Sequence, residues 1–178
     1  PMSETEKWGV LEDVFDQLTF NAIEIRSAGH AFKNILDFVK DAQDHLLTPH
    51  DISEYVARLR NAGVAPKAEP LVQQWDDMSK AFVAYQQRKL ETGAIDYGDQ
   101  ITYAVEILRS FPMITAALQA RHPYLFVDEY QDSNPAQREL VLELVDPTDS
   151  KLFVIGDDDQ AIFRFQGANV RNILRLPE

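Results

Sequence analysis

Two short apolar runs, Tyr124–Val127 and Leu152–Ile155, constrain the fold most, because the long helical patterns elsewhere in the chain leave these as the only convincing strands. Both runs are almost continuously hydrophobic, which is typical of parallel strands that are covered on both faces. Between them, Asn134-Pro135 opens a helix that extends to about Val145, and Gln137 can complete a capping box. Strand, helix and strand together predict a right-handed crossover unit.

The rest of the chain is predicted to be helical, because its apolar residues recur at intervals of three and four. The expected helices span about residues 8–18, 32 to just before Thr48-Pro49, 51–60, 70–91, 100–109 and 112–121. Asp51 or Ser53 is the candidate cap of the third helix, and Gly93 ends the fourth. We expect the aromatic residues of these helices, including Trp8 and Trp75, to pack in the core.

Composition limits the possible functions. The 178 residues are enough for one domain or two small ones, and they carry a net charge of -12. That charge argues against nucleic-acid binding by this chain alone, because phosphate neutralisation supplies most non-specific affinity. Cysteine is absent, which excludes disulfides and thiolate metal sites and fits a cytoplasmic setting. The four histidines lack metal-ligand spacing, and no apolar stretch approaches the roughly 18 residues needed to cross a bilayer.

Acidic residues follow both predicted strands. Asp128-Glu129 comes directly after the first strand, and the acidic loop Gly156–Gln160 follows the second. The carboxyl ends of parallel strands face one crevice, so both loops are expected to border the same site. An apolar strand that ends in Asp-Glu is the Walker B arrangement of ATPases, and a simple solvated turn is the alternative. The consecutive acids do not fit an EF-hand, whose ligands alternate along the loop.

Two aromatic residues lie shortly after the second acidic loop. Phe163 and Phe165 would point to the same side of an extended chain. Exposed rings in such an arrangement form a stacking platform for nucleic-acid bases. The alternative is that both rings pack beneath the loop.

The sequence VDEYQDSNPAQ (Val127–Gln137), followed by VIGDDDQAIFRFQGAN (Val154–Asn169), resembles motifs II and III of UvrD/Rep-type superfamily 1 DNA helicases. AIDYGDQI (Ala94–Ile101) resembles the segment that precedes motif II in that family. The close resemblance covers about residues 94–175. It implies an α/β fold that is mostly helical. Residues 1–93 would form the helical accessory insertion of the first motor domain, and 94–178 the C-terminal part of that RecA-like, P-loop NTPase domain.

The resemblance also implies roles for individual residues in ATP hydrolysis. Asp128 would hold the Mg²⁺ of the bound ATP, and Glu129 would activate the attacking water. Gln160 would contact the γ-phosphate and take part in catalysis. Three residues would couple the nucleotide site to motif III and the second motor domain, namely Gln131, Asp132 and Asp157.

The resemblance places single-stranded DNA against the aromatic pair. Phe163 and Phe165 would stack on its bases, although many family members have tyrosine and tryptophan there. Gln166 replaces an arginine of many family members, so a contact that needs that charge is lost. The implied activity is ATP-driven translocation on single-stranded DNA with duplex unwinding, 3′ to 5′, in DNA repair.

Two parts of such a motor are not found in this sequence. No glycine precedes a lysine, so the phosphate-cradling Walker A loop is expected upstream. The second motor domain would supply an arginine finger, which is worth roughly 10³–10⁵ in rate. We therefore expect the 178-residue chain alone to be inactive. The alternative function is a non-catalytic, helicase-like scaffold or protein-interaction module. Another Walker-type ATPase is disfavoured by Gln160 together with Phe163 and Phe165.

Overall fold

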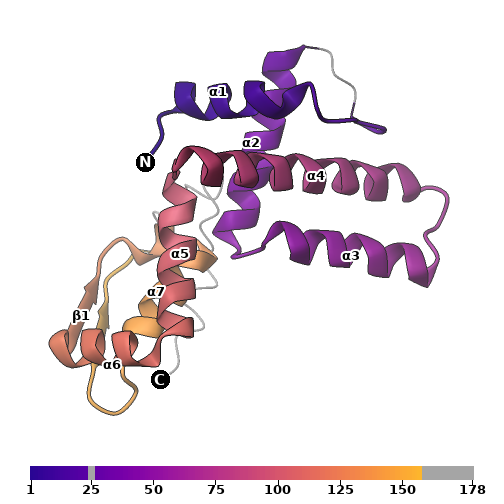
Figure 1. The fold of residues 1–178 in the computed structure, drawn as a ribbon. Helices are drawn as coiled ribbons and strands as arrows, with labels where there is room; N and C mark the ends of the chain where they lie inside the picture. The colour runs from indigo at the N-terminus through magenta and orange to yellow at the C-terminus, as the bar shows by residue number, and fades with distance from the viewer. Residues whose placement is uncertain (24–26, 158–178) are drawn as a thin grey trace. The chain divides into compact units, whose positions relative to one another are not determined.

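The computed structural model describes residues 1–23 and 27–157 and is mostly helical, with one two-stranded parallel sheet (Figure 1). The chain divides into two compact units. The first, called the helical unit here, holds residues 1–43 and 47–97, and the second, called the sheet unit, holds 44–46 and 98–178. The elements are α1 (Glu4–Phe15), α2 (Ala28–Asp44), α3 (Pro49–Ala62), α4 (Glu69–Thr92), α5 (Tyr97–Ser110), α6 (Pro112–Arg121), β1 (Tyr124–Val127), η1 (Tyr130–Asp132), α7 (Pro135–Leu144) and β2 (Lys151–Val154).

Helices α1 and α3 of the helical unit begin with capping boxes. Helix α1 begins four residues before the predicted Trp8, because the hydroxyl of Ser3 accepts the Glu6 amide while the Glu6 carboxylate accepts the Ser3 amide. Helix α3 begins in the same way. Thr48 is its cap, and Asp51 is the reciprocal partner three residues later, so the prediction of Asp51 or Ser53 as the cap was wrong. These interactions satisfy amides that have no partner inside the helix.

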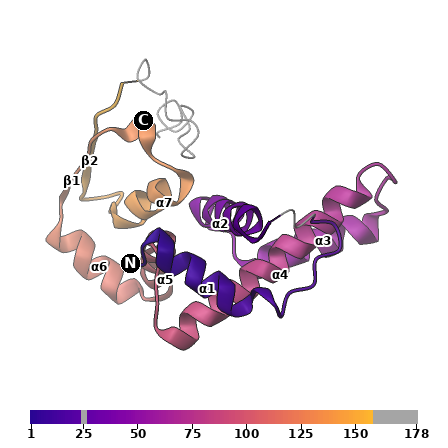
Figure 2. The same cartoon turned by 90° about the horizontal axis from the view of Figure 1, so that it is seen from above.

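The core of the helical unit lies between α1, α2 and α4 (Figure 2). Its most deeply buried side chains include Leu11, Ile35 and Tyr85. The prediction that the aromatic residues pack in the core is confirmed for Tyr85 but was wrong for both tryptophans. Trp8 is 39% exposed and Trp75 is 38% exposed. Each lies at the edge of the core, because helical spacing places a residue on a face without fixing how far another element covers it.

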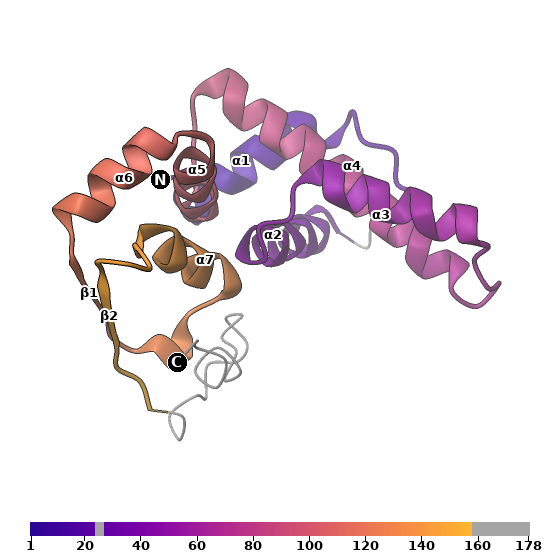
Figure 3. The same ribbon diagram turned by 90° about the horizontal axis from the view of Figure 1, so that it is seen from below.

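The sheet unit contains a parallel strand pair joined through α7. Tyr124 pairs with Lys151, and the register continues to Val127 and Val154. Parallel pairing was predicted, although β2 begins and ends one residue earlier than expected. The predicted capping box of α7 is confirmed, because Asn134 and Gln137 exchange side-chain and backbone hydrogen bonds. Helix α7 lies alongside both strands in Figures 2 and 3.

The two faces of the sheet differ in exposure, contrary to the prediction that both would be covered. Leu125, Val127, Leu152 and Val154 are half-buried, whereas the alternate side chains are exposed. Phe126 and Phe153 belong to the exposed set and stack on each other with ring centroids 4.8 Å apart. Among the described residues, helices cover only one face, so a continuously apolar run still produces alternating burial.

Helices α5 and α6 precede the sheet. Helix α5 begins at Tyr97, three residues earlier than predicted, and α6 has the predicted bounds. Within the sheet unit, Arg109 binds Glu139 and Glu143 of α7 through contacts of 2.7 and 2.6 Å. Within the described ranges, no single helix is long and apolar enough to cross a membrane. Only α5 and α6 taken together pass that test of length and composition, and they are bent by 105° relative to each other.

Candidate nucleotide site

The candidate site is built on the turn that follows β1. Backbone hydrogen bonds hold this turn against the end of β2, because Ile155 donates to the Val127 carbonyl at 2.8 Å and Tyr130 donates to the Ile155 carbonyl at 3.0 Å. Between these bonds, Glu129 adopts a left-handed conformation with φ 51° and ψ 39°. That conformation costs a non-glycine residue roughly 1–2 kcal/mol. Glutamate occupies this position although glycine would avoid the cost, so its side chain is a candidate for a functional role.

Gln131 connects the two loops at the strand ends. Its side chain is 1% exposed. Its Nε2 donates to Oε2 of Glu129 at 2.6 Å, and its Oε1 accepts the Asp157 amide at 3.0 Å. One buried amide therefore restrains the Glu129 carboxylate and the start of the second acidic loop at once. The structure brings Glu129, Gln131 and Asp157 together, while their roles in catalysis and coupling stay predictions.

Asp128 lies at the end of β1 with its side chain exposed. Its Oδ1 accepts the Glu129 amide at 2.9 Å. No described residue donates to its second oxygen, and no described lysine or arginine pairs with it. A carboxylate of this kind fits Mg²⁺, which is usually held by one or two carboxylates together with phosphates and waters. The described residues contain no group of three acidic, histidine or cysteine side chains that could hold a metal alone.

The turn continues into the buried helix η1. Tyr130 is 1% exposed, and burial raises the pKa of its phenol, while the nearby Arg138 partly opposes that shift. The Oδ1 atom of Asp132 is also buried and has no hydrogen-bond partner among the described residues. An unpaired buried acceptor is rare and costs about 1–3 kcal/mol, so Asp132 remains a candidate for contact with a further group. The predicted residues Gln160, Phe163 and Phe165 lie outside the described residues.

Sequence reasoning missed a buried polar cluster around Asp96 in the helical unit. Asp96 accepts from Lys89 at 2.7 Å, from Gln43 at 3.2 Å and from the hydroxyl of Tyr85 at 3.3 Å. The Lys89 ammonium also lies 4.6 Å from the centre of the Tyr85 ring. Lys89 and Asp96 are almost fully buried. The sequence pattern that could have indicated this cluster is Lys89 on the buried face of α4, seven residues before Asp96.

The fold and the site first define a class of protein. A parallel strand pair joined through a helix is the arrangement of α/β proteins, and adjacent carboxylates follow its first strand. The family comparison is more specific. The model for the UvrD/REP helicase N-terminal domain matches residues 9–178. The chain therefore belongs to the UvrD/REP helicase family, as its resemblance to motifs II and III predicted.

Curated relatives agree with this family. The chain is 36% identical over 138 residues to the ATP-dependent DNA helicase UvrD1 of Mycobacterium tuberculosis (strain ATCC 25618 / H37Rv), covering 71% of this chain and 18% of that protein. It is 33% identical to the ATP-dependent DNA helicase PcrA of Leuconostoc citreum, over 81% of this chain and 17% of the relative. DNA helicase II of Rickettsia typhi is 31% identical, with 81% and 22% covered. The chain spans about a fifth of the length of these relatives.

Proposed function

We propose that this chain is part of an ATP-dependent DNA helicase in which Asp128 binds Mg²⁺ and Glu129 orients the attacking water. The observation that carries the proposal is the buried Gln131 amide, which restrains the Glu129 carboxylate against the backbone of Asp157. A water-orienting carboxylate must be held in position, because a misplacement of about 1 Å can cost about 10² in rate. Mg-ATP, when bound, supplies the phosphoryl group that is transferred to water.

The same proposal includes the finer features of the helicase. The region 94–178 is the C-terminal part of a RecA-like motor domain, and 1–93 is its helical insertion. The whole protein translocates on single-stranded DNA, 3′ to 5′, with Phe163 and Phe165 stacked on the bases and Gln160 at the γ-phosphate. It works in DNA repair in the cytoplasm. The support is the motif resemblance together with family membership over residues 9–178.

The direct test is Glu129→Gln in the full-length protein that contains this chain. The substitution keeps the hydrogen-bonding shape but removes the carboxylate, so we expect ATP binding to persist and turnover to fall by about 10²–10⁴. Glu106→Gln is the matched control. It makes the same chemical change at an exposed position of α5, outside the strand-end loops. Unimpaired ATP hydrolysis by the Glu129 variant would contradict the proposal.

A further inference from the structure

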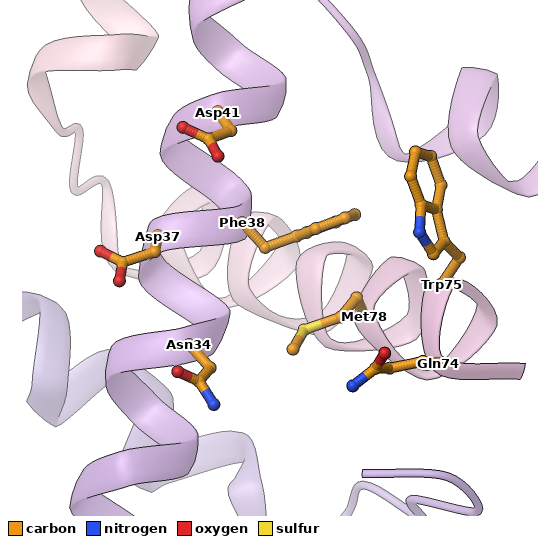
Figure 4. A pocket seen from close by; sticks show the side chains of 7 residues that line it. All are labelled: Asn34, Asp37, Phe38, Asp41, Gln74, Trp75 and Met78. Atoms are coloured by element: carbon orange, nitrogen blue, oxygen red, sulfur yellow. The ribbon is translucent and has the colours of Figure 1, made fainter. Parts of the chain in front are cut away.

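The helical unit contains a pocket of about 350 Å³ between α2 and α4. Phe38 projects from α2 toward Trp75 across the hollow, and Met78 and Gln74 border it from α4 (Figure 4). The Phe38 and Trp75 rings meet edge to face with centroids 6.2 Å apart. Only Met78 among these side chains is buried, so the aromatic walls remain partly open to solvent.

The apolar surface continues beyond the pocket. Tyr55 of α3 lies 5.8 Å from Trp75 between ring centroids and is 45% exposed. Leu71 lies one turn before Trp75 on α4, and it is also exposed. Large apolar side chains from α2, α3 and α4 are thus gathered beside one hollow. Adjacent exposed residues of this kind mark interaction sites, and tryptophan and tyrosine are enriched among residues that dominate binding energy.

The polar edge of the pocket is acidic. Asp37 and Asp41 line it from α2 and lie one turn apart, and they project from a different side of that helix than Phe38 (Figure 4). None of the described residues that line the pocket is basic. Asp37 makes no hydrogen bond or ion pair with another described residue. The basic residues of the same helix are Lys33 and Lys40, and neither lines the pocket.

We propose that this pocket binds a basic amphipathic helix of another protein. One large apolar side chain of that helix packs against the exposed surfaces of Phe38 and Trp75. Lysine or arginine side chains one turn apart contact Asp37 and Asp41. This is a helix-in-groove mode, in which anchors at intervals of three or four residues supply affinity and the charged rim supplies orientation and selectivity.

The charge of the pocket decides between a peptide and a nucleic acid. Phosphates would approach the carboxylates of Asp37 and Asp41, and no lysine or arginine is among the described residues that line the pocket. A cationic helix would instead be attracted to these carboxylates, and its apolar face would cover Trp75. The pocket residues belong to the helical unit and the strand-end carboxylates to the sheet unit, so the proposal does not depend on the proposed ATP hydrolysis.

The probe is a fluorescein-labelled, 18-residue helical peptide with leucines along one face and lysines on both flanks. Its binding to the 178-residue chain is measured by anisotropy, alongside a peptide with glutamate in place of lysine and a labelled single-stranded oligonucleotide. We expect binding of the lysine peptide only. Asp37→Lys should weaken that binding about tenfold, and Trp75→Ala should weaken it by more than tenfold.

Two matched variants separate the pocket from general attraction to an acidic chain. Glu12→Lys makes the same change in charge on α1, and Trp8→Ala removes the other tryptophan, which is exposed to the same extent as Trp75. Both should bind the lysine peptide like the parent chain, with folding checked by circular dichroism. Equal losses in Glu12→Lys and Asp37→Lys would overturn the proposal. So would equal losses in the two tryptophan variants, absence of lysine-peptide binding, or oligonucleotide binding that depends on Trp75.

Discussion

At the residue scale, Gln131 carries the most specific information about the candidate site. Its side chain bonds to Glu129 after β1 and to the Asp157 amide after β2, and so joins the two strand-end loops. These two hydrogen bonds require an amide, which has one donor end and one acceptor end. The sequence placed it in a motif and predicted a coupling role. It could not show the 2.6 Å contact with Glu129, because that contact depends on the left-handed conformation of Glu129 itself.

Gln131→Ala in the full-length protein should lower kcat for ATP hydrolysis about tenfold to a hundredfold, with a smaller change in KM. The reason is that the Glu129 carboxylate loses its restraint while the nucleotide keeps its other contacts. Steady-state kinetics measure both parameters. Gln119→Ala is the control, because this amide also bonds backbone, to the Glu143 and Val145 carbonyls, but lies near the amino ends of the strands, opposite the candidate site. The same kcat loss in both variants would show a general structural effect instead.

The buried ion pair of Asp96 and Lys89 predicts a large effect on the free energy of unfolding. Asp96→Asn removes the carboxylate that lies 2.7 Å from the buried Lys89 ammonium, so we expect the free energy of unfolding to fall by about 3–5 kcal/mol. Adding Lys89→Met should recover much of that loss, because the double variant removes both charges of this buried pair. Urea unfolding of the parent, both single variants and the double variant gives the coupling energy. If the losses of the two single variants simply add, the pair is not coupled.

At the element scale, the types and order of the elements could be predicted, while several ends and caps could not. Helix α6, strand β1 and the capping box of α7 agree with the prediction because proline, apolar runs and Asn134 mark them locally. The start of α1 was missed although Ser3 and Glu6 carry the capping-box spacing. For α3, Asp51 and Ser53 were the candidate caps, whereas the structure uses Thr48, because Thr48 and Asp51 form a capping box.

Asp77 of α4 holds the loop at Asn21 and Ala22, and this contact predicts how the free energy of unfolding changes at acid pH. Both Asn21 and Ala22 donate their backbone amides to Oδ2 of Asp77 at 2.7 Å. Burial raises the pKa of Asp77, but these hydrogen bonds outweigh it and hold the pKa below its usual value. A lowered folded-state pKa contributes stability above the unfolded-state value of about 3.9, and that stability is lost as pH falls through the folded-state pKa.

Asp77→Asn should therefore lower the free energy of unfolding at pH 7 by about 2 kcal/mol, and it should reduce the loss of stability below about pH 4. Denaturant unfolding at a series of pH values measures both effects. Asp76→Asn is the neighbouring control. Its carboxylate pairs at the surface with Lys80 and Arg60, so we expect a cost of at most about 1 kcal/mol. An unchanged pH dependence in the Asp77 variant would contradict the assignment.

At the scale of the whole molecule, the sequence predicted an α/β chain that is mostly helical, and it indicated the family. It did not predict which apolar surfaces stay exposed. Phe126, Phe153 and Trp75 fit core patterns, yet each is exposed because coverage depends on elements that are far away in the sequence.

The exposed face that carries Phe126 and Phe153 should bind the dye ANS, which fluoresces on apolar surfaces. Phe126→Ser should weaken the ANS fluorescence and lower the free energy of unfolding by at most about 1 kcal/mol.

The strand-end carboxylates alone do not make a complete nucleotide site. Asp128 and Glu129 can serve Mg²⁺ and water, but the 178-residue sequence contains no Gly-Lys pair to hold the phosphates. We therefore expect calorimetric titration of this chain with ATP and Mg²⁺ to show no micromolar binding. The full-length protein should bind under the same conditions, and Asp128→Asn in that protein should weaken the Mg²⁺ dependence of binding. Micromolar affinity of the chain alone would mean that other residues of this chain hold the phosphates.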